Sequence, residues 1–365
     1  MLKVGAQLAK PRFGAYNTNQ VHNSKDHRKV KKVGQLYAIG EVLIDFIPLQ
    51  KGHPLKDVIA FERAAGGAPA NVAAAVSKFG GKASMLTKLG ADPFGDYLLE
   101  QLKAAGVNTE HVKRTKEANT GLAFVSLRED GERDFSFYRN PSADLLLSPN
   151  EVDPAIFSSN DILHFCSVDL VDSPMKQAHL KAIEVVKEKG GLVSFDPNVR
   201  LPLWDNAEKC KETIQNFIPT AHIVKISDEE LEFVTGISDM DEAIASLFQG
   251  DVKVVIYTRG KDGAELYISP DTKYVGSGFS VKVQDTTGAG DAFVGGFLYQ
   301  LLEKRAVQDN LTDIIHAYGQ EILQFANASG AITTMGKGAI PALPSRAMIA
   351  DFINNQLNEG MKPNV

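Results

Sequence analysis

The chain has 365 residues, of which 44% are hydrophobic and 23% charged, values typical of a globular protein with a substantial core. Its formal net charge of −6 argues against a nucleic-acid partner, because no basic excess is available to neutralise phosphates. The two cysteines, Cys166 and Cys210, form no CxxC pair, so neither a disulfide framework nor a structural zinc site is expected. No apolar run approaches the ~18 residues of a membrane span, and no membrane partner is expected.

The first 32 residues differ in composition from the rest, with eight Lys or Arg against a single acidic residue, Asp26. No apolar stretch follows the basic residues, so a secretory signal is not expected. We interpret residues 1–32 as a disordered basic extension, or as the product of a start codon placed too far upstream. Organelle import stays open, because import presequences are also basic and poor in acids. The expected location is the cytoplasm.

Residues 33–355 read as one α/β domain, followed by a C-terminal tail over residues 356–365. Apolar runs predict strands at residues 36–40, 161–166, 192–196, 222–226 and 252–258. Amphipathic or Pro-started segments predict helices at residues 69–79, 175–189 and 207–217. This alternation predicts a mostly parallel sheet covered by helices on both faces, with ligands at the carboxyl ends of the strands.

One region breaks this alternation. Residues 122–127 and 133–138 flank Asp130-Gly131, a strong hairpin signal. Two other extended segments, residues 43–49 and 58–62, are able to pair with this hairpin. Together they predict a small β-sheet, formed by about residues 43–63 and 120–140, that acts as a lid over a ligand cleft. An added edge of the main sheet is the alternative.

The segment Asp285-Thr286-Thr287-Gly288-Ala289-Gly290-Asp291 carries the clearest chemical signal. It precedes an apolar run with the character of a buried helix. Small residues at a helix start leave backbone N–H groups accessible, and the helix dipole favours an anion there. A carboxylate in that position, Asp291, is explained if it takes a proton beside an incoming phosphate. The segment therefore suggests phosphoryl transfer to a hydroxyl.

Other polar segments follow predicted strands or open helices, and each has a structural alternative. Gly66-Gly67-Ala68-Pro69-Ala70-Asn71 suits a ligand held by Asn71, or is ordinary loop chemistry. Asp45 is either paired structurally or binds a polyol. Residues 196–200 suit a cleft or a solvated turn, and residues 258–263 suit a nucleotide or a hairpin turn. Residues 327–334 read as a small-residue helix that bounds an adenine or only packs closely.

Ser227 and Glu230 have the spacing of a complete capping box for a helix that ends at Gly236. That structural role alone would explain both residues. The P-loop and protein-kinase signatures are absent, and no GxGxxG follows the first strand. P-loop kinases, protein kinases and dinucleotide-dependent dehydrogenases are therefore disfavoured.

Residues 66–71 and 285–291 together resemble the two signatures of the PfkB/ribokinase-like sugar kinases. The resemblance extends from about residue 36 to residue 352, and the second motif is highly specific. Within that family, residues 40–45, 137–144 and 195–204 look most like fructokinase. The resemblance implies a ribokinase-like three-layer sandwich with a small β-sheet lid. It also implies transfer of phosphate from ATP to D-fructose, giving D-fructose 6-phosphate and ADP.

The resemblance also implies roles for individual residues. It makes Asp291 the catalytic base and the amides of Gly288, Ala289 and Gly290 the anion hole. The residues that it assigns to the sugar are Asp45, Gly66, Gly67 and Asn71, with Arg139 and Arg200 as further sugar or phosphate contacts. Those that it assigns to ATP are Ser227, Thr258, Arg259, Gly260, Lys261, Gly263 and Asn327. Those that it assigns to a monovalent cation, usually K⁺, are Asp285, Thr287, Thr333 and Gly338.

The sequence departs from the family at the magnesium-associated motif Asn-x-x-Glu, because Ser227 stands in the Asn position while Glu230 is kept. Glu230 is expected to order the water shell of Mg²⁺, and a direct contact from residue 227 to phosphate is in doubt. A kinase for 2-keto-3-deoxygluconate, ribose or an aminosugar stays open, as does a catalytically inactive sugar-binding relative. A homodimer through the lid is an expectation by analogy.

Overall fold

The structure is a computed structural model that describes residues 33–50, 52–127 and 133–359. The predicted basic extension at residues 1–32 and the tip of the predicted hairpin, residues 128–132, lie outside these ranges. So do residues 360–365, the last part of the predicted tail. Helix α9 (Arg346–Glu359) continues beyond residue 355, so the sequence-based boundary of the domain falls inside this helix.

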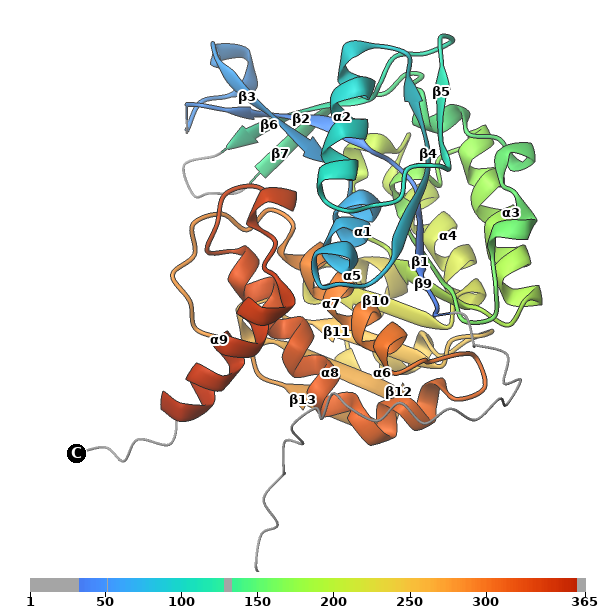
Figure 1. The fold of residues 1–365 in the computed structure, drawn as a ribbon, viewed down its shortest axis with the longest axis vertical. Helices are drawn as coiled ribbons and strands as arrows, with labels where there is room; N and C mark the ends of the chain where they lie inside the picture. Colours follow the sequence, from blue (N-terminus) through green and yellow to red (C-terminus); the bar gives the residue numbers. More distant parts are fainter. Residues whose placement is uncertain (1–32, 51, 128–132, 360–365) are drawn as a thin grey trace, which may run out of the picture. The chain divides into compact units, whose positions relative to one another are not determined.

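A nine-stranded sheet forms the centre of the described part of the chain, in the order β13-β12-β11-β10-β9-β8-β1-β4-β5 (Figure 1). The pairs from β11 to β5 are parallel, whereas β12 and β13 run antiparallel at one edge. The strands are β1 (Leu36–Ile39), β4 (Ala83–Gly90), β5 (Val112–Thr115), β8 (Ile162–Cys166), β9 (Leu192–Asp196), β10 (Ile223–Ser227), β11 (Val254–Thr258), β12 (Ala264–Ser269) and β13 (Thr272–Gly276).

Helices cover both faces of this sheet, as the sequence predicts. The face that carries Leu36 and Ala38 of β1 packs on α1 (Ala68–Lys78), α2 (Pro93–Ala104), α7 (Ala289–Glu303) and α8 (Leu311–Thr333). The face that carries Tyr37 and Ile39 packs on α3 (Pro174–Glu188), α4 (Ala207–Phe217), α5 (Asp228–Thr235) and α6 (Met240–Ser246). Successive side chains of a strand point to opposite faces, so an all-apolar strand such as β1 requires this double cover.

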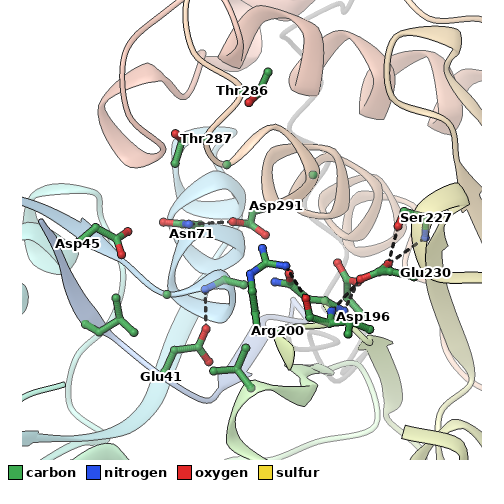
Figure 2. A pocket seen from close by; sticks show the side chains of 18 of the residues that line it. Glu41, Asp45, Asn71, Asp196, Arg200, Ser227, Glu230, Thr286, Thr287 and Asp291 are labelled. Atoms are coloured by element: carbon green, nitrogen blue, oxygen red, sulfur yellow. Dashed lines mark hydrogen bonds between the residues drawn. The ribbon is translucent and has the colours of Figure 1, made fainter. Parts of the chain in front are cut away.

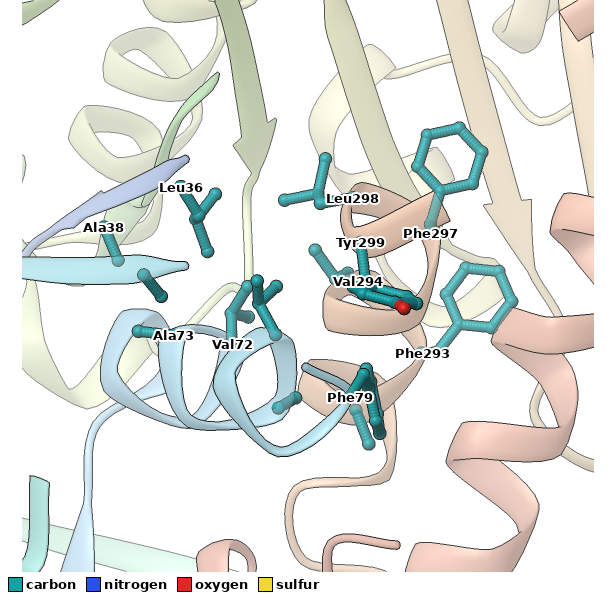
Figure 3. Packing of buried hydrophobic residues seen from close by; sticks show 14 of the residues in the cluster. Leu36, Ala38, Val72, Ala73, Phe79, Phe293, Val294, Phe297, Leu298 and Tyr299 are labelled. Atoms are coloured by element: carbon teal, nitrogen blue, oxygen red, sulfur yellow. The ribbon is translucent and has the colours of Figure 1, made fainter. Parts of the chain in front are cut away.

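Helices α1 and α7 pack closely against each other, and this contact sets up the site described below (Figure 3). Val72 of α1 and Val294 of α7 belong to the same buried cluster. The helices approach so closely at Gly295 that a Cβ there would lie 2.5 Å from the Cβ of Ala75. Because the interface is apolar and lacks space for a side chain at residue 295, the start of α7 is fixed relative to the start of α1.

A second sheet of four strands, in the order β3-β2-β6-β7, stands apart from the main sheet (Figure 1). We call it the lid; its strands are β2 (Leu43–Pro48), β3 (Phe61–Gly66), β6 (Leu122–Leu127) and β7 (Arg133–Tyr138). Strand β2 pairs antiparallel with β3 and parallel with β6, and β6 pairs antiparallel with β7. The predicted separate sheet is confirmed, and the alternative of an added edge to the main sheet is wrong.

The lid is joined to the main sheet by a buried group of charges. Arg139 directly follows β7, is 7% exposed, and forms ion pairs with Asp144 and with Asp169, which follows β8. Ser142 also donates a hydrogen bond to Asp144. Both carboxylates are buried, so each depends on the guanidinium for compensation. We call Arg139, Asp144 and Asp169 the lid anchor.

We expect Arg139→Met to destabilise the protein by about 3–5 kcal/mol, because it leaves two buried carboxylates without their counter-charge. Urea unfolding would measure the change. Lys181→Met is the control, since it removes an exposed ion pair with Glu184 and should leave stability nearly unchanged. Equal stability of the two variants would contradict a stabilising role for the lid anchor.

Candidate active site

A cavity of about 800 Å³ opens at the carboxyl ends of the parallel strands, between the main sheet and the lid (Figure 2). Its volume suits a small metabolite with part of a nucleotide. Strands β1, β9 and β10 contribute residues at or just beyond their ends, as expected for a parallel sheet. The lid contributes Leu43, Asp45, Ile47, Val125 and Phe137, and the start of α7 with the preceding loop contributes Thr286, Thr287, Gly288, Gly290 and Asp291.

Asp291 lies in the first turn of α7 and is held by Asn71 from the first turn of α1. Asn71 Nδ2 donates a 2.8 Å hydrogen bond to Asp291 Oδ2, across 220 residues of sequence (Figure 2). Asn71 is 6% exposed, and Asp291 is partly buried in the cavity wall. The carboxylate is thereby fixed in orientation, and both residues face the same cavity.

Burial raises the pKa of Asp291, while the hydrogen bond from Asn71 and the positive charges of Arg200 and Lys225 lower it. The net shift is upward. A carboxylate with a raised pKa is a better proton acceptor than an ordinary exposed one. The environment of Asp291 is therefore suited to general-base chemistry.

The loop before α7 is shaped by Asp285. Its Oδ1 accepts hydrogen bonds from the backbone N–H (3.0 Å) and the hydroxyl (2.6 Å) of Thr287, and its Oδ2 accepts one from Gly338 N–H (2.9 Å). Gly288, the N-cap of α7, has φ +75°, and a Cβ on it would lie 2.5 Å from the Cβ of Ala339. Glycine is therefore required there. A Cβ added at Gly290 would have no neighbour within 4 Å, so the first turn of α7 stays open toward the cavity.

The predicted sugar residues lie close together. Asp45 and Gly67 line the cavity with Asn71, and Gly66 packs against Asp45 so tightly that a Cβ would lie 2.1 Å from its Oδ2. Gly67 has φ +111°, and a Cβ there would lie 2.3 Å from the carbonyl oxygen of Glu41. Gly67 is therefore required by its conformation and by close approach of the backbone, whereas a side chain at residue 66 would displace the carboxylate of Asp45. The surrounding lid side chains are mostly apolar, which leaves Asp45 as the polar contribution of the lid to this cavity.

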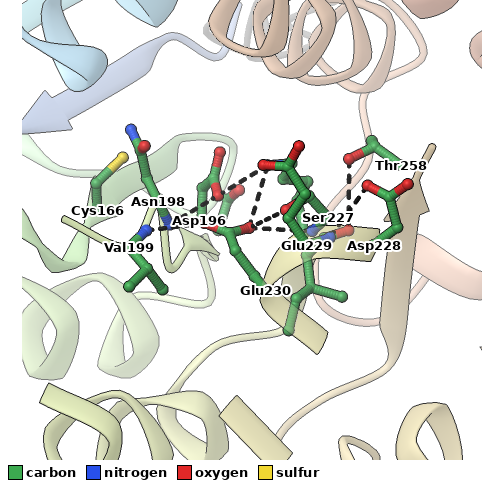
Figure 4. Close-up of polar contacts among 12 residues, drawn as sticks. Cys166, Asp196, Asn198, Val199, Ser227, Asp228, Glu229, Glu230 and Thr258 are labelled. Atoms are coloured by element: carbon green, nitrogen blue, oxygen red, sulfur yellow. Dashed lines mark hydrogen bonds and ion pairs between the residues drawn. The ribbon is translucent and has the colours of Figure 1, made fainter. Parts of the chain in front are cut away.

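Asp196 at the end of β9 and Glu230 just after β10 lie close together (Figure 4), and a buried lysine connects them. Lys225 Nζ lies 3.2 Å from Asp196 Oδ1 and 3.7 Å from Glu230 Oε2, and all three residues line the cavity. Glu230 Oε2 also accepts hydrogen bonds from Ser227 N–H (3.0 Å) and Oγ–H (2.8 Å), and its Oε1 accepts one from Val199 N–H (2.8 Å). The capping box at the start of α5 is thus confirmed, and Gly236 ends the helix in the left-handed conformation.

The pKa values in this group diverge. Burial raises the pKa of Asp196 to about 6, although Lys225 opposes the shift. For Glu230, burial is outweighed by Lys225 and the hydrogen bonds from Val199 and Ser227, and the pKa is lowered. Asp196 and Glu230 raise the pKa of Lys225 despite its burial, so the lysine is charged. Glu230 is therefore a firmly ionised carboxylate at the cavity wall.

The two arginines predicted to contact sugar or phosphate have different positions. Arg200 lines the cavity, and its Nη1 donates a 2.8 Å hydrogen bond to the carbonyl of Val199. Arg139 belongs to the lid anchor and does not line this cavity. The guanidinium of Arg139 is engaged by two buried carboxylates, and its contact with sugar or phosphate stays a prediction.

Most of the predicted ATP residues lie outside the walls of this cavity. Ser227 lines it, and Thr258 pairs with Ser227 in register at the end of the neighbouring strand. Arg259, Gly260, Lys261 and Gly263 form the turn between the antiparallel strands β11 and β12, so the hairpin alternative is confirmed for this segment. Asn327 is buried in α8, where its Nδ2 donates to the carbonyls of Gly276 (3.1 Å) and Ser277 (3.2 Å).

The predicted cation residues converge around Asp285. Thr287 and Gly338 bind its carboxylate directly, and the adjacent carbonyl of Thr334 accepts hydrogen bonds from Gln284 and Asp285 N–H. Thr333 is fully buried, and its hydroxyl donates to the carbonyl of Ser329. Carboxylate and carbonyl oxygens are hard ligands suited to alkali and alkaline-earth cations. Within the described ranges, no group of three or more His, Cys, Asp or Glu is placed to hold a metal ion.

Two cavity residues, Glu41 and Lys225, were not selected from the sequence as site residues. Both lie close to the carboxyl end of a parallel strand, and that position is the available signal. Glu41 lies two residues beyond β1, and Lys225 lies within β10, two residues before its last residue, Ser227. Both residues stand among apolar residues in the sequence, and a charged residue in such a run also fits a structural ion pair, so the sequence does not single them out as site residues.

Known proteins resemble this chain over most of its length. Fructokinase-2 of Solanum lycopersicum is 46% identical over 313 residues, covering 86% of this chain and 94% of that protein. The crystal structure of a Xylella fastidiosa fructokinase with bound ATP matches with a TM-score of 0.81 at 36% identity, covering 88% and 99% of the two chains.

A Vibrio cholerae fructokinase, solved with fructose, ADP and calcium, matches with a TM-score of 0.77 at 35% identity, covering 88% and 99% of the two chains. A double mutant described under the same name and source was solved with fructose, ADP and potassium; it is 34% identical, with a TM-score of 0.77 and coverage of 88% and 98%. The model of the pfkB family carbohydrate kinases matches residues 34–346. With the ribokinase-like sandwich, the separate lid and the Asn71–Asp291 pair in one cavity, the chain belongs to the pfkB family of carbohydrate kinases.

Proposed function

We propose that the protein is an ATP-dependent fructokinase that converts D-fructose and ATP into D-fructose 6-phosphate and ADP. The observation that carries this proposal is the Asn71–Asp291 hydrogen bond at the start of α7, where a base lies beside an open helix N-terminus. The likeness to fructokinases that hold ATP, or fructose with ADP, supports the choice of both substrates.

In the proposed reaction, Asp291 accepts the proton of the sugar hydroxyl while the hydroxyl oxygen forms a bond to the γ-phosphorus of ATP. The bond from that phosphorus to the β,γ-bridging oxygen breaks, and ADP leaves. The amides of Gly288, Ala289 and Gly290 lie at the N-terminus of α7 and would stabilise negative charge on the transferred group, for which the Ala289 N–H has to release its 3.3 Å hydrogen bond to the carbonyl of Thr286. The lid excludes water, which would otherwise compete with the sugar for the phosphoryl group.

Asp45, Asn71 and Arg200 supply the polar groups for the sugar, while Gly66 and Gly67 allow the backbone to come close to it. ATP would extend from the cavity past Ser227 and Thr258 toward the turn at residues 259–263 and toward Asn327. This path is supported by the register of β10 and β11, whose ends lie side by side. The proposed cationic contacts to phosphate are Arg259 and Lys261.

Mg²⁺ would bind beside Glu230, whose carboxylate, kept ionised by its lowered pKa, would order the water shell of the ion. When bound, it would neutralise charge on the ATP phosphates. The capping box holds Glu230 in place, so Ser227 acts by orienting this carboxylate. A monovalent cation, K⁺, would bind at Asp285 with carbonyls of Thr287, Thr333 and Gly338, and would stabilise the loop that precedes the anion hole.

Several finer points belong to the same proposal. A homodimer through the lid is supported by exposed apolar side chains on Tyr138 of β7 and on Leu49 and Ile59 in the connection between β2 and β3. A cytoplasmic location stays a prediction, since residues 1–32 lie outside the described part of the chain. Among the described helices, none combines the length and apolarity needed to cross a bilayer.

The substrate is tested by assaying purified protein with ATP, Mg²⁺ and a sugar panel that includes 2-keto-3-deoxygluconate, ribose and aminosugars. We expect fructose to give the highest kcat/KM. Fast turnover of another sugar with slow turnover of fructose would overturn the fructose assignment while preserving the kinase assignment.

Asp291→Asn tests the base in the same assay. We expect kcat to fall by about 10²–10⁴-fold, because proton transfer to a positioned base is lost. Fructose binding, measured by calorimetry, should stay close to wild type, since the amide keeps the shape of the side chain. Wild-type turnover by this variant would eliminate Asp291 as the base.

The pH profile tests the environment of Asp291. The base works only when ionised, so kcat/KM should fall as pH drops through a raised pKa, above the ordinary aspartate value of ~4. Arg200→Met removes a charge that lowers this pKa and should move the acid limb to higher pH, whereas Arg200→Lys should restore it. Asp196→Asn removes the titration of Asp196, another acid of the cavity wall with a pKa of about 6, and so tests whether that residue causes the acid limb. If the acid limb moves in Asp196→Asn but not in Arg200→Met, the limb reports the titration of Asp196 and not that of Asp291, and the prediction is contradicted.

Potassium dependence tests the cation site. We expect turnover in K⁺ to be several-fold higher than in tetramethylammonium, which is too large for a cage of carbonyl oxygens. Asp285→Asn keeps the size of the side chain but removes its charge, so the ratio of the two rates should approach one. Undiminished K⁺ activation in that variant would place the cation elsewhere.

A further inference from the structure

Glu41 is a buried carboxylate in the cavity wall to which neither the family signatures nor the proposed mechanism gives a role. It lies in the connection between β1 and β2 and is 3% exposed. Its Oε1 accepts a 2.9 Å hydrogen bond from the backbone N–H of Ala68, the first residue of α1 (Figure 2). The carbonyl of Glu41 also abuts Gly67, where even a Cβ would not fit. Glu41 therefore contacts the start of α1 through both its backbone and its side chain.

Helix α1 needs such a contact, because its own N-cap residue, Gly67, has no side chain to accept a hydrogen bond. A side-chain carboxyl oxygen near a helix N-terminus satisfies one of the unpaired N–H groups. Here the carboxyl group comes from a different part of the chain, 27 residues before Ala68. Glu41 is thus a tertiary cap of α1.

The capped turn is the one that carries Asn71. Asn71 N–H donates a 2.9 Å hydrogen bond to the carbonyl of Gly67, and its side chain donates to Asp291. A continuous path of short contacts therefore runs from Glu41 through the first turn of α1 to the base. A displacement of this turn would change the aim of Asn71 and hence the orientation of Asp291.

The charges of the lid anchor influence the pKa of Glu41. Burial and the neighbouring Asp169 raise its pKa well above the ordinary value, and Arg139 lowers it in part. Its second oxygen, Oε2, is buried and accepts no hydrogen bond from the described residues. The Glu41 carboxyl is thus buried and hydrogen-bonded to the start of α1, so we expect it to be a fixed group that supports this helix.

We propose that Glu41 is a positioning residue for phosphoryl transfer, which fixes the first turn of α1 so that Asn71 holds Asp291 in its reactive orientation. The inference rests on the proposed role of Asp291 as base. It adds a residue that acts through Asn71 and does not itself touch the reacting atoms.

The test compares Glu41→Ala and Glu41→Gln in the full-length protein. Loss of the acceptor in Glu41→Ala should lower kcat at least ~10-fold, since small misplacements of reacting groups cost up to ~10²-fold, and KM for ATP should change less than ~2-fold. Glu41→Gln keeps a side-chain oxygen for Ala68 N–H and should return kcat to within ~3-fold of wild type. If Glu41→Ala does not fold, Glu41→Met fills the same space without an acceptor and takes its place.

Asp161 provides matched controls. It is 1% exposed, and its carboxylate accepts backbone hydrogen bonds from Gln35 (3.0 Å) and Ser158 (2.7 Å) at the amino end of the sheet, away from the cavity. Asp161→Ala should lower Tm as Glu41→Ala does, yet leave kcat unchanged. Equal kcat losses in the two alanine variants would reduce Glu41 to a general stabilising residue and overturn the proposal.

Two further measurements separate this inference from the proposed function. Glu41→Ala combined with Asn71→Ala should be no slower than the slower single variant, because both act on Asp291 by the same path; fully multiplicative losses would contradict that path. Hydrogen exchange of the peptide covering residues 67–76 should be faster in Glu41→Ala than in Asp161→Ala, whatever the substrate is. Inactivity of the wild type toward every sugar would refute the proposed function, whereas unchanged exchange in Glu41→Ala would refute the anchoring alone.

Discussion

The hydrogen bond between Asn71 and Asp291 is the interaction on which the rest of the site depends. It joins the first turns of two helices that are separated by most of the sequence. Its length of 2.8 Å is possible only because α1 and α7 pack in close contact, with Gly295 against Ala75. The apolar packing of α1 against α7 therefore sets the distance between Asn71 and Asp291 at which their hydrogen bond forms. Buried polar pairs of this kind are sensitive to small shifts in packing.

The cavity contains several acids and few bases, although its proposed nucleotide ligand is an anion. Glu41, Asp45, Asp196, Glu229, Glu230 and Asp291 line it, against Lys225 and Arg200. The structure separates the pKa values of these acids by their partners: Glu230 is held ionised by Lys225 and backbone donors, whereas Asp196 and Glu41 shift upward through burial. Divergent pKa values among neighbouring carboxylates are a common basis for assigning them different tasks.

The lid and the main sheet are linked by the buried ion pairs of the lid anchor, and the cavity lies between them. Arg139 at the end of β7 is held by Asp144 and Asp169, and Glu41 lies within range of the same charges. From Glu41, contacts continue into α1 and reach Asp291. The charges of the lid anchor therefore influence the pKa of Glu41, and Glu41 in turn contacts the start of α1.

The sequence by itself determined the alternation of strands and helices, the lid hairpin, the capping box at Ser227 and Glu230, and the glycine-rich start of α7. These are local patterns, written in the spacing of apolar residues, in turn residues and in caps, so they do not need distant contacts. It did not reveal the helix α9 beyond residue 355. Only the tertiary structure decided that Arg139 belongs to the lid anchor and that residues 259–263 form a hairpin turn. Only the tertiary structure showed that Glu41 caps a helix that begins 27 residues later. The physical reason is that burial, and the partner of each charge, depend on which segments the packing brings together.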